Sequence, residues 1–143
     1  MSEEVEVKGE CDQEQKADLL ARAAALLFPI QWPEPFGLVM TEAMACGTPV
    51  LAWRNGSVPE VVADGETGFI VTSVEEMAAA VDRVGDLDPR VMRARVEEQF
   101  SADAMVAGYE NVYQQVLAHD DGHAGQVQRL KDWRPGEHRA AKR

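Results

Sequence analysis

Three short apolar runs, separated by segments with helical patterning, constrain the fold of this chain more than any other feature. The runs are Ala25–Pro29, Pro49–Trp53 and Gly68–Val71. Apolar runs of this length, with no polar residue between the apolar ones, are typical of strands buried on both faces of a parallel sheet. Because strands that alternate with helices form layered α/β structures, the sequence predicts an α/β fold with a parallel sheet.

Helical patterning fills the rest of the chain as far as about residue 119. The expected helices are Gln13–Ala24, about Phe36–Cys46, Val58–Ala63, Val74 to about Val84, Pro89–Phe100 and a long one from Ser101 to about His119. Gly47 is placed to cap the second helix at its C-terminus. Ser73 and Glu76 have the spacing of a capping box for the fourth. The alternation in Val5–Gly9 predicts a further short strand.

The last part of the chain differs in composition from the part before it. From Asp120 onward the sequence is polar, with Gly and Pro and no periodicity. Such a segment has too few apolar residues to form a packed core, so residues 120–143 are predicted to be a disordered tail. Residues 1–119 are accordingly predicted to form one domain. His119 and His123 have a spacing that could suit a metal, but Gly122 interrupts the helix between them, so we favour a solvated tail.

Charge and apolar content exclude several classes of function. The net charge is −11, and residues 19–123 carry sixteen acidic and six basic residues, which argues against nucleic-acid binding. No apolar run approaches the roughly 20 residues that span a bilayer, so no transmembrane segment is expected. The acidic N-terminus has no apolar signal-peptide core. Cys11 and Cys46 are expected to be free thiols, and we expect a cytoplasmic protein.

Two carboxylates, Glu34 and Glu42, stand with seven residues between them. Glu34 lies in a loop bounded by prolines, and Glu42 lies on the helix that follows. That helix is nearly apolar all round, which predicts that it is buried on every side. A buried carboxylate is costly without a partner, so Glu42 needs donors, either internal groups or the hydroxyls of a ligand. From these residues alone, Glu34 could equally be a solvated loop residue.

The sequence around these glutamates resembles the donor-site segment of retaining nucleotide-sugar glycosyltransferases of family 4, which have the two-domain GT-B architecture. The resemblance rests on Trp32–Ala52 and continues through Gly56–Glu60 and Asp64–Val71. It implies a Rossmann-like half-domain, the second part of the C-terminal donor-binding domain, followed by C-terminal helices. The first half of that domain and the acceptor-binding domain are expected to come from an N-terminal domain outside this sequence or from a partner chain.

The resemblance also implies roles for individual residues. The backbone amides of Phe36, Gly37 and Leu38 would meet the distal phosphate of a nucleoside-diphosphate sugar, as helix N-termini commonly do. Glu42 would accept hydrogen bonds from the ribose hydroxyls. Glu34 would hold hydroxyls of the transferred sugar and act as the catalytic residue. Neither a metal nor another cofactor is implied.

A second loop, after the run Pro49–Trp53, offers further contacts to the donor. Arg54, Asn55, Gly56 and Glu60 are candidates, although a plain connection between strand and helix is nearly as good an interpretation. Many members of the resembled family have paired glycines here. Asn55 tolerates positive φ, so the same backbone path is expected. Glu60 could hold the loop and make no ligand contact.

Other large side chains are expected to pack in the interior. Trp32 could stack on a base or sugar, but we favour packing against the neighbouring helix. The methionines that fall on predicted helices are interpreted as core residues. They are Met40, Met44, Met77, Met92 and Met105.

Two alternatives to a glycosyltransferase donor domain remain open. The chain could be a truncated or split, non-catalytic fragment that binds a partner or a nucleotide, or a GT-B-like sugar-nucleotide epimerase. In the resembled family, the Arg and Lys that clamp the diphosphate lie in segments before this sequence begins. A helix N-terminus supplies only about half a unit charge in their place. We therefore expect that the chain by itself does not transfer sugar.

Overall fold

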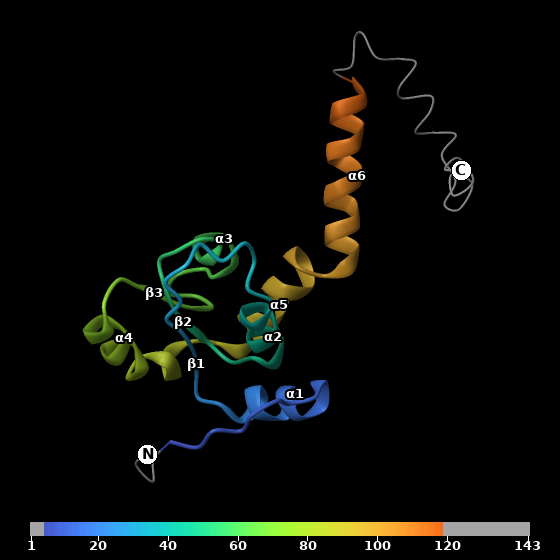
Figure 1. Ribbon diagram of the computed structural model, residues 1–143. Coiled ribbons are helices and arrows are strands. Elements are labelled where there is room, and N and C mark those ends of the chain that lie inside the picture. Colours follow the sequence, from blue (N-terminus) through green and yellow to red (C-terminus); the bar gives the residue numbers. More distant parts are fainter. Residues whose placement is uncertain (1–4, 119–143) are drawn as a thin grey trace, which may run out of the picture. The chain divides into compact units, whose positions relative to one another are not determined.

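The computed structural model describes residues 5–118 of the chain (Figure 1). The chain divides into two compact units, one that ends at Ser101 and one that begins at Ala102. The first unit contains the sheet and five helices among its described residues. Of the second unit the structure describes one helix, α6 (Ala102–Ala118). The predicted tail over 120–143 and the histidine pair lie outside the described residues.

The sheet has three parallel strands in the order β1-β2-β3. They are β1 (Leu26–Phe28), β2 (Val50–Trp53) and β3 (Gly68–Val71), and each lies within the apolar run that predicted it. The predicted α/β fold with a parallel sheet is therefore confirmed. The strand predicted at Val5–Gly9 is wrong, because this segment is exposed and pairs with no strand of the described chain.

All the predicted helices form, most of them a few residues shorter than expected. Those of the first unit are α1 (Gln13–Arg22), α2 (Leu38–Cys46), α3 (Val58–Val61), α4 (Val74–Val81) and α5 (Pro89–Gln99), with a single 3₁₀ turn at Val84–Asp86. Gly47 caps α2 as predicted, with φ 81°. The Ser73 hydroxyl accepts from the Glu76 N–H, but the Glu76 carboxylate accepts from Thr72, so only half of the predicted capping box forms.

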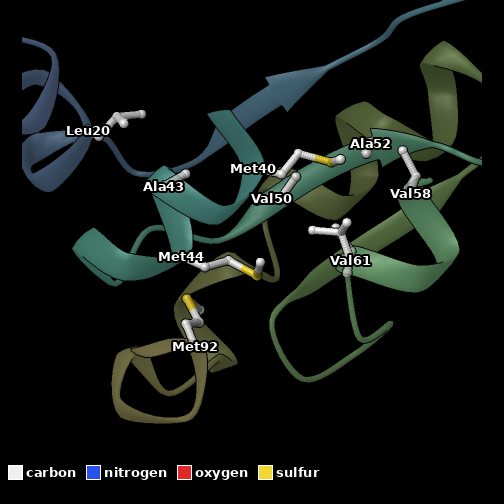
Figure 2. Close-up of a cluster of buried hydrophobic side chains, with 10 residues drawn as sticks. Leu20, Met40, Ala43, Met44, Val50, Ala52, Val58, Val61 and Met92 are labelled. Atoms are coloured by element: carbon white, nitrogen blue, oxygen red, sulfur yellow. The ribbon is translucent and has the colours of Figure 1, made fainter. Parts of the chain in front are cut away.

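The two faces of the sheet carry separate apolar clusters. On one face, Val50 and Ala52 of β2 pack with α2, α3 and α5. Figure 2 shows this cluster, in which Met44 extends from α2 toward α5 and its Met92. On the other face, Leu51 packs with Phe69, Val71 and residues of α4. The first unit is thus a three-layer arrangement, with α4 on one side of the sheet and α2 and α5 on the other (Figure 1).

Some side chains predicted to be interior are exposed. Met40, Met44, Met77 and Met92 are buried as predicted, but Met105 on α6 is 57% exposed. On α1, the apolar pattern favours an inward position for both Leu19 and Leu20, but only Leu20 is buried and Leu19 is exposed. The prediction that α2 is buried on every side is wrong as well, because Leu38 and Ala45 face solvent. The apolar helix α2 therefore has one side exposed to solvent.

The described residues also bear on three predicted features of the chain. No helix among residues 5–118 is long and apolar enough to cross a membrane. Cys11 and Cys46 are free thiols, as predicted. In the same part of the chain no group of three or more His, Cys, Asp or Glu side chains is placed to hold a metal ion.

Candidate functional site

The candidate residues lie in the loops that follow the carboxyl ends of β1 and β2 and in the helices α2 and α3 that these loops enter. In open α/β sheets, ligands bind at this edge. A shallow pocket of about 290 Å³ opens there, lined by residues that follow each of the three strands. The lining residues are Ile30, Gln31, Trp53, Arg54, Asn55, Val71 and Thr72. Glu34 and Glu42 do not line this pocket but belong to the neighbouring loop and to α2.

The loop after β1 is folded around Glu34 by short-range hydrogen bonds. The Glu34 N–H donates to the Trp32 carbonyl at 2.9 Å, and the Trp32 indole N–H donates to Glu34 Oε2, also at 2.9 Å. Trp32 is 59% exposed, so the predicted packing of its ring against a helix is wrong. The indole instead orients the Glu34 carboxylate and leaves Oε1 without a partner among residues 5–118.

The loop after β2 supports the Glu34 loop directly. Ser57 donates its backbone N–H to the Glu34 carbonyl at 2.9 Å and its hydroxyl to the Phe36 carbonyl at 2.8 Å. Gly56 has φ +49°, and a Cβ there would stand 2.5 Å from the Glu34 nitrogen and oxygen. The close approach requires glycine at this position. The positive φ lies at Gly56 and not at Asn55, contrary to expectation.

The N-terminus of α2 is not capped by any side chain. Gly37 is the N-cap residue, with φ 75°, and its carbonyl accepts from Met40. Within the described part of the chain, the N–H groups of Gly37, Leu38 and Val39 donate to no acceptor. Free N–H groups and the helix dipole together make such a terminus attractive to an anion. Phe36 and Leu38 beside it are both exposed.

Glu42 lies one turn further along α2 and has an internal partner. Lys16 Nζ of α1 is 2.5 Å from Glu42 Oε1, and each side chain is 32% exposed. Internal donors were one of the two alternatives that the sequence left open, but Lys16 itself was missed. The two residues are 26 positions apart, and no sequence pattern links a lysine of one helix to a glutamate of another. Oε2 of Glu42 makes no hydrogen bond within residues 5–118.

Arg54 and Glu60 are placed less closely around these groups. The Arg54 backbone N–H donates to the Val71 carbonyl at 3.0 Å, and its exposed side chain makes no polar contact with the rest of the described chain. The Glu60 carbonyl accepts from Arg95 Nη2 at 2.9 Å, while the Glu60 side chain is exposed. Neither side chain contacts Glu34 or Glu42.

The fold is similar to part of a known enzyme structure. Sucrose-phosphate synthase from Thermosynechococcus elongatus matches with a TM-score of 0.62 and 34% sequence identity, over 77% of this chain and 29% of that one. This match confirms the predicted Rossmann-like half-domain of GT-B type.

Comparison of sequences agrees with the structural match. The family model for glycosyl transferases group 1 matches residues 1–99. The N-acetyl-alpha-D-glucosaminyl L-malate synthase of Bacillus anthracis is 36% identical over 116 residues, which cover 76% of this chain and 30% of that protein. The MMP alpha-(1->4)-mannosyltransferase of Mycolicibacterium hassiacum is 37% identical over 128 residues, 82% of this chain and 31% of that protein. The chain thus spans less than a third of these relatives, and it belongs to the family of glycosyl transferases group 1.

Proposed function

We propose that the chain carries the donor-binding part of a retaining glycosyltransferase whose donor is a nucleoside-diphosphate sugar. One observation carries the proposal: the uncapped N-terminus of α2 lies between two carboxylates, Glu34 before it and Glu42 one turn into the helix. A sugar nucleotide has two phosphates between two groups rich in hydroxyls. Amide donors flanked by carboxylate acceptors match that order of groups.

In this proposal the phosphates bind at the start of α2. The free N–H groups at Gly37 and Leu38, with that of Phe36, donate to the distal phosphate. Oε2 of Glu42 accepts from ribose hydroxyls, while Lys16 holds the other oxygen of the same carboxylate. Oε1 of Glu34 accepts from hydroxyls of the sugar, while the Trp32 indole holds Oε2. Each glutamate is thus fixed at one oxygen and open at the other.

The same arrangement supports a role for the amides in catalysis. Negative charge develops on the diphosphate as it leaves the sugar, and preorganised donors at that point stabilise the transition state. A helix N-terminus supplies only about half a unit charge, so further cations are required. We propose that these cations and the acceptor site belong to parts of the enzyme outside residues 1–143, that no metal ion is needed, and that the enzyme is cytoplasmic. Expressed by itself, the chain is then expected to bind the donor without transferring sugar.

Isothermal titration of the chain with nucleoside diphosphates, with and without an attached sugar, tests the proposal. Glu42→Gln is expected to weaken binding of the bare nucleoside diphosphate by about tenfold, equivalent to about 1.4 kcal/mol. Glu34→Gln should leave that affinity unchanged and weaken only the sugar-bearing ligand. Glu66→Gln, in an exposed turn, serves as the matched control. The proposal is overturned if wild type binds none of these ligands, or if Glu34→Gln is the variant that loses the bare nucleotide.

A further inference from the structure

We propose that Arg95 of α5 is a positioning residue for the loop Ile30–Gly37, acting on it through α3 and through Phe100. Calling this loop donor-binding rests on the proposed function, but the mechanical coupling does not. Arg95 is about sixty positions from the loop in sequence, and the proposed function gives it no contact with the donor. Its contacts nevertheless lead to the loop by two routes.

The first route begins at the C-terminal end of α3. Arg95 Nε donates to the Val61 carbonyl and Nη2 donates to the Glu60 carbonyl, both at 2.9 Å. A helix of four residues has almost no stability of its own, because its terminal carbonyls lack partners within the helix. The planar guanidinium donates to two of these carbonyls at once in a fixed geometry. Arg95 therefore fixes the position of α3.

The other end of α3 holds the loop. Ser57, the N-cap residue of α3, accepts from the Val61 N–H at 3.0 Å through its carbonyl. Ser57 also donates to the carbonyls of Glu34 and Phe36. A shift of α3 would move Ser57 and, with it, the backbone on both sides of Pro35. The first route thus runs from Arg95 along α3 to the backbone of Glu34.

The second route passes through aromatic rings at the end of α5. The Arg95 guanidinium carbon lies 5.7 Å from the centroid of the Phe100 ring. The Phe100 ring meets the Phe36 ring edge to face, with centroids 5.8 Å apart and an interplanar angle of 71°. Both contacts have the geometry of favourable cation–π and aromatic pairs. Phe36 is therefore held at its carbonyl by Ser57 and at its ring by Phe100.

Arg93, two residues earlier on α5, provides a matched control. Its Nη2 donates to the Cys46 carbonyl at 2.9 Å, at the C-terminal end of α2 and away from the helix start. Arg93 and Arg95 thus make the same type of contact, from the same helix, to the ends of two different helices. Both helices lead back to the loop, but α2 has nine residues and its own ladder of hydrogen bonds, whereas α3 has only four residues. Loss of the Arg95 contact is therefore the change expected to reach the loop.

The Trp32 indole N–H is a spectroscopic reporter of the loop, because it donates to Glu34. Its signal in a ¹H–¹⁵N correlation spectrum of the full chain is assigned with Trp32→Phe. Arg95→Met is expected to shift or broaden this signal and to speed hydrogen exchange at the Ser57 amide. Arg93→Met should leave both unchanged. Arg95→Lys, which keeps the charge and hydrogen-bond donors but not the planar guanidinium, should recover part of the wild-type shift.

Nucleotide affinity gives the second measurement. Arg95→Met should weaken binding of a nucleoside diphosphate by about tenfold, and Arg93→Met should not. If Arg95→Met fails to fold, Phe100→Leu tests the aromatic route, since it removes the ring contact with Phe36 and keeps an apolar side chain. An unchanged Trp32 signal in a folded Arg95→Met chain, or in Arg95→Lys and Phe100→Leu together, overturns the positioning role. Absence of nucleotide binding in wild type overturns the proposed function alone, because the spectra still decide the coupling.

Discussion

The two edge strands of the sheet, β1 and β3, differ in whether their outward-facing backbone groups are hydrogen-bonded. At the β3 edge, the outward N–H of Ile70 donates to Asp64 Oδ1 at 2.9 Å, and the N–H of Thr72 donates to Glu76 Oε2 at 2.7 Å. The Gly68 carbonyl accepts from Gly65 at 2.8 Å. At the β1 edge, the outward N–H and carbonyl are those of Leu27, because its neighbours face β2. Leu27 finds no backbone partner in the described chain, and its side chain is 53% exposed.

This difference indicates at which edge strand a further strand could pair with the sheet. An exposed edge strand is a template for another strand, and proteins commonly block such an edge with charged side chains. The carboxylates of Asp64 and Glu76 block the β3 edge by taking its outward N–H groups. The β1 edge has no such block among the described residues, and α4 packs mainly on β2 and β3. A further strand is therefore accommodated beside β1, the strand that leads into the Glu34 loop.

Two glycines with positive φ, one in the loop after β2 and one in the turn before β3, should respond very differently to the same substitution. Gly56, with φ +49°, packs on the Glu34 backbone, whereas Gly65, with φ +79°, has open space around its Cβ position. Gly65→Ala should cost only the strain of positive φ, about 1–2 kcal/mol. Gly56→Ala adds overpacking against backbone and should cost about 3 kcal/mol or more in total.

Urea unfolding of the two alanine variants measures this difference in the free energy of unfolding. The Trp32 indole signal provides a local readout, and it should move in Gly56→Ala alone. Equal losses of stability in the two variants would show that the loop Ile30–Gly37 moves to accommodate the new methyl group. The loop would then be less rigid than its contacts indicate.

Self-association of the chain should depend on the β1 edge. Leu27→Lys places a charge on the unblocked edge strand, a common device against strand pairing. We expect it to weaken self-association by at least about tenfold, equivalent to about 1.4 kcal/mol. Sedimentation velocity across a range of concentrations measures the effect.

The control for this substitution is Val81→Lys on α4, which makes the same change of charge at a site of similar exposure, 45% against 53% for Leu27. It should leave association unchanged. If both variants dissociate equally, net charge and not the β1 edge governs association. If neither does, the contact lies elsewhere on the chain.

Removing one block from the β3 edge should have a smaller effect. Asp64→Ala leaves the Ile70 N–H without its acceptor, which should lower the free energy of unfolding by about 1 kcal/mol. Glu66→Ala, in the same exposed turn, removes a carboxylate with no recorded partner in residues 5–118 and should be neutral. Thermal unfolding of both variants tests this, and an equal change in the two would refute the blocking role of Asp64.

The sequence predicted the parts of this fold that depend on local pattern. The three apolar runs gave the strands, and Gly47 gave the end of α2, because each of these signals lies within a few residues of its effect. Val5–Gly9 alternates as a strand would, yet strand formation depends on a partner that the local sequence does not specify. The exposed side of α2 was missed for a similar reason. The apolar composition of a helix does not show which other elements pack against it.

Contacts between distant segments of the candidate site were not predictable in the same way. The glutamates and the Gly37 turn were identified from one continuous segment of sequence. The partner of Glu42 is Lys16 on another helix, and the support of the Glu34 carbonyl is Ser57 in another loop. These pairs depend on how separate elements pack together, and they produce no periodic pattern in the sequence. The roles of the site residues in donor binding remain predictions.

The smallest expected effect concerns the pH dependence of the second block on the β3 edge. The pKa of Glu76 lies below its ordinary value, first because the Thr72 backbone N–H donates to its carboxylate and then because the Thr72 hydroxyl does. A lowered pKa in the folded state means that the stabilisation is present above the ordinary glutamate value of about 4.3 and is lost as the pH falls through the lowered value.

Glu76→Gln should therefore be less stable than wild type at neutral pH, and the difference should shrink in acid as the wild-type carboxylate takes up a proton. Urea unfolding of both proteins at several pH values measures this, with the exposed neighbour Glu75→Gln as control. A difference that stays constant with pH would mean that the charge of Glu76 has no part in blocking this edge, leaving Asp64 as its one acidic block among the described residues.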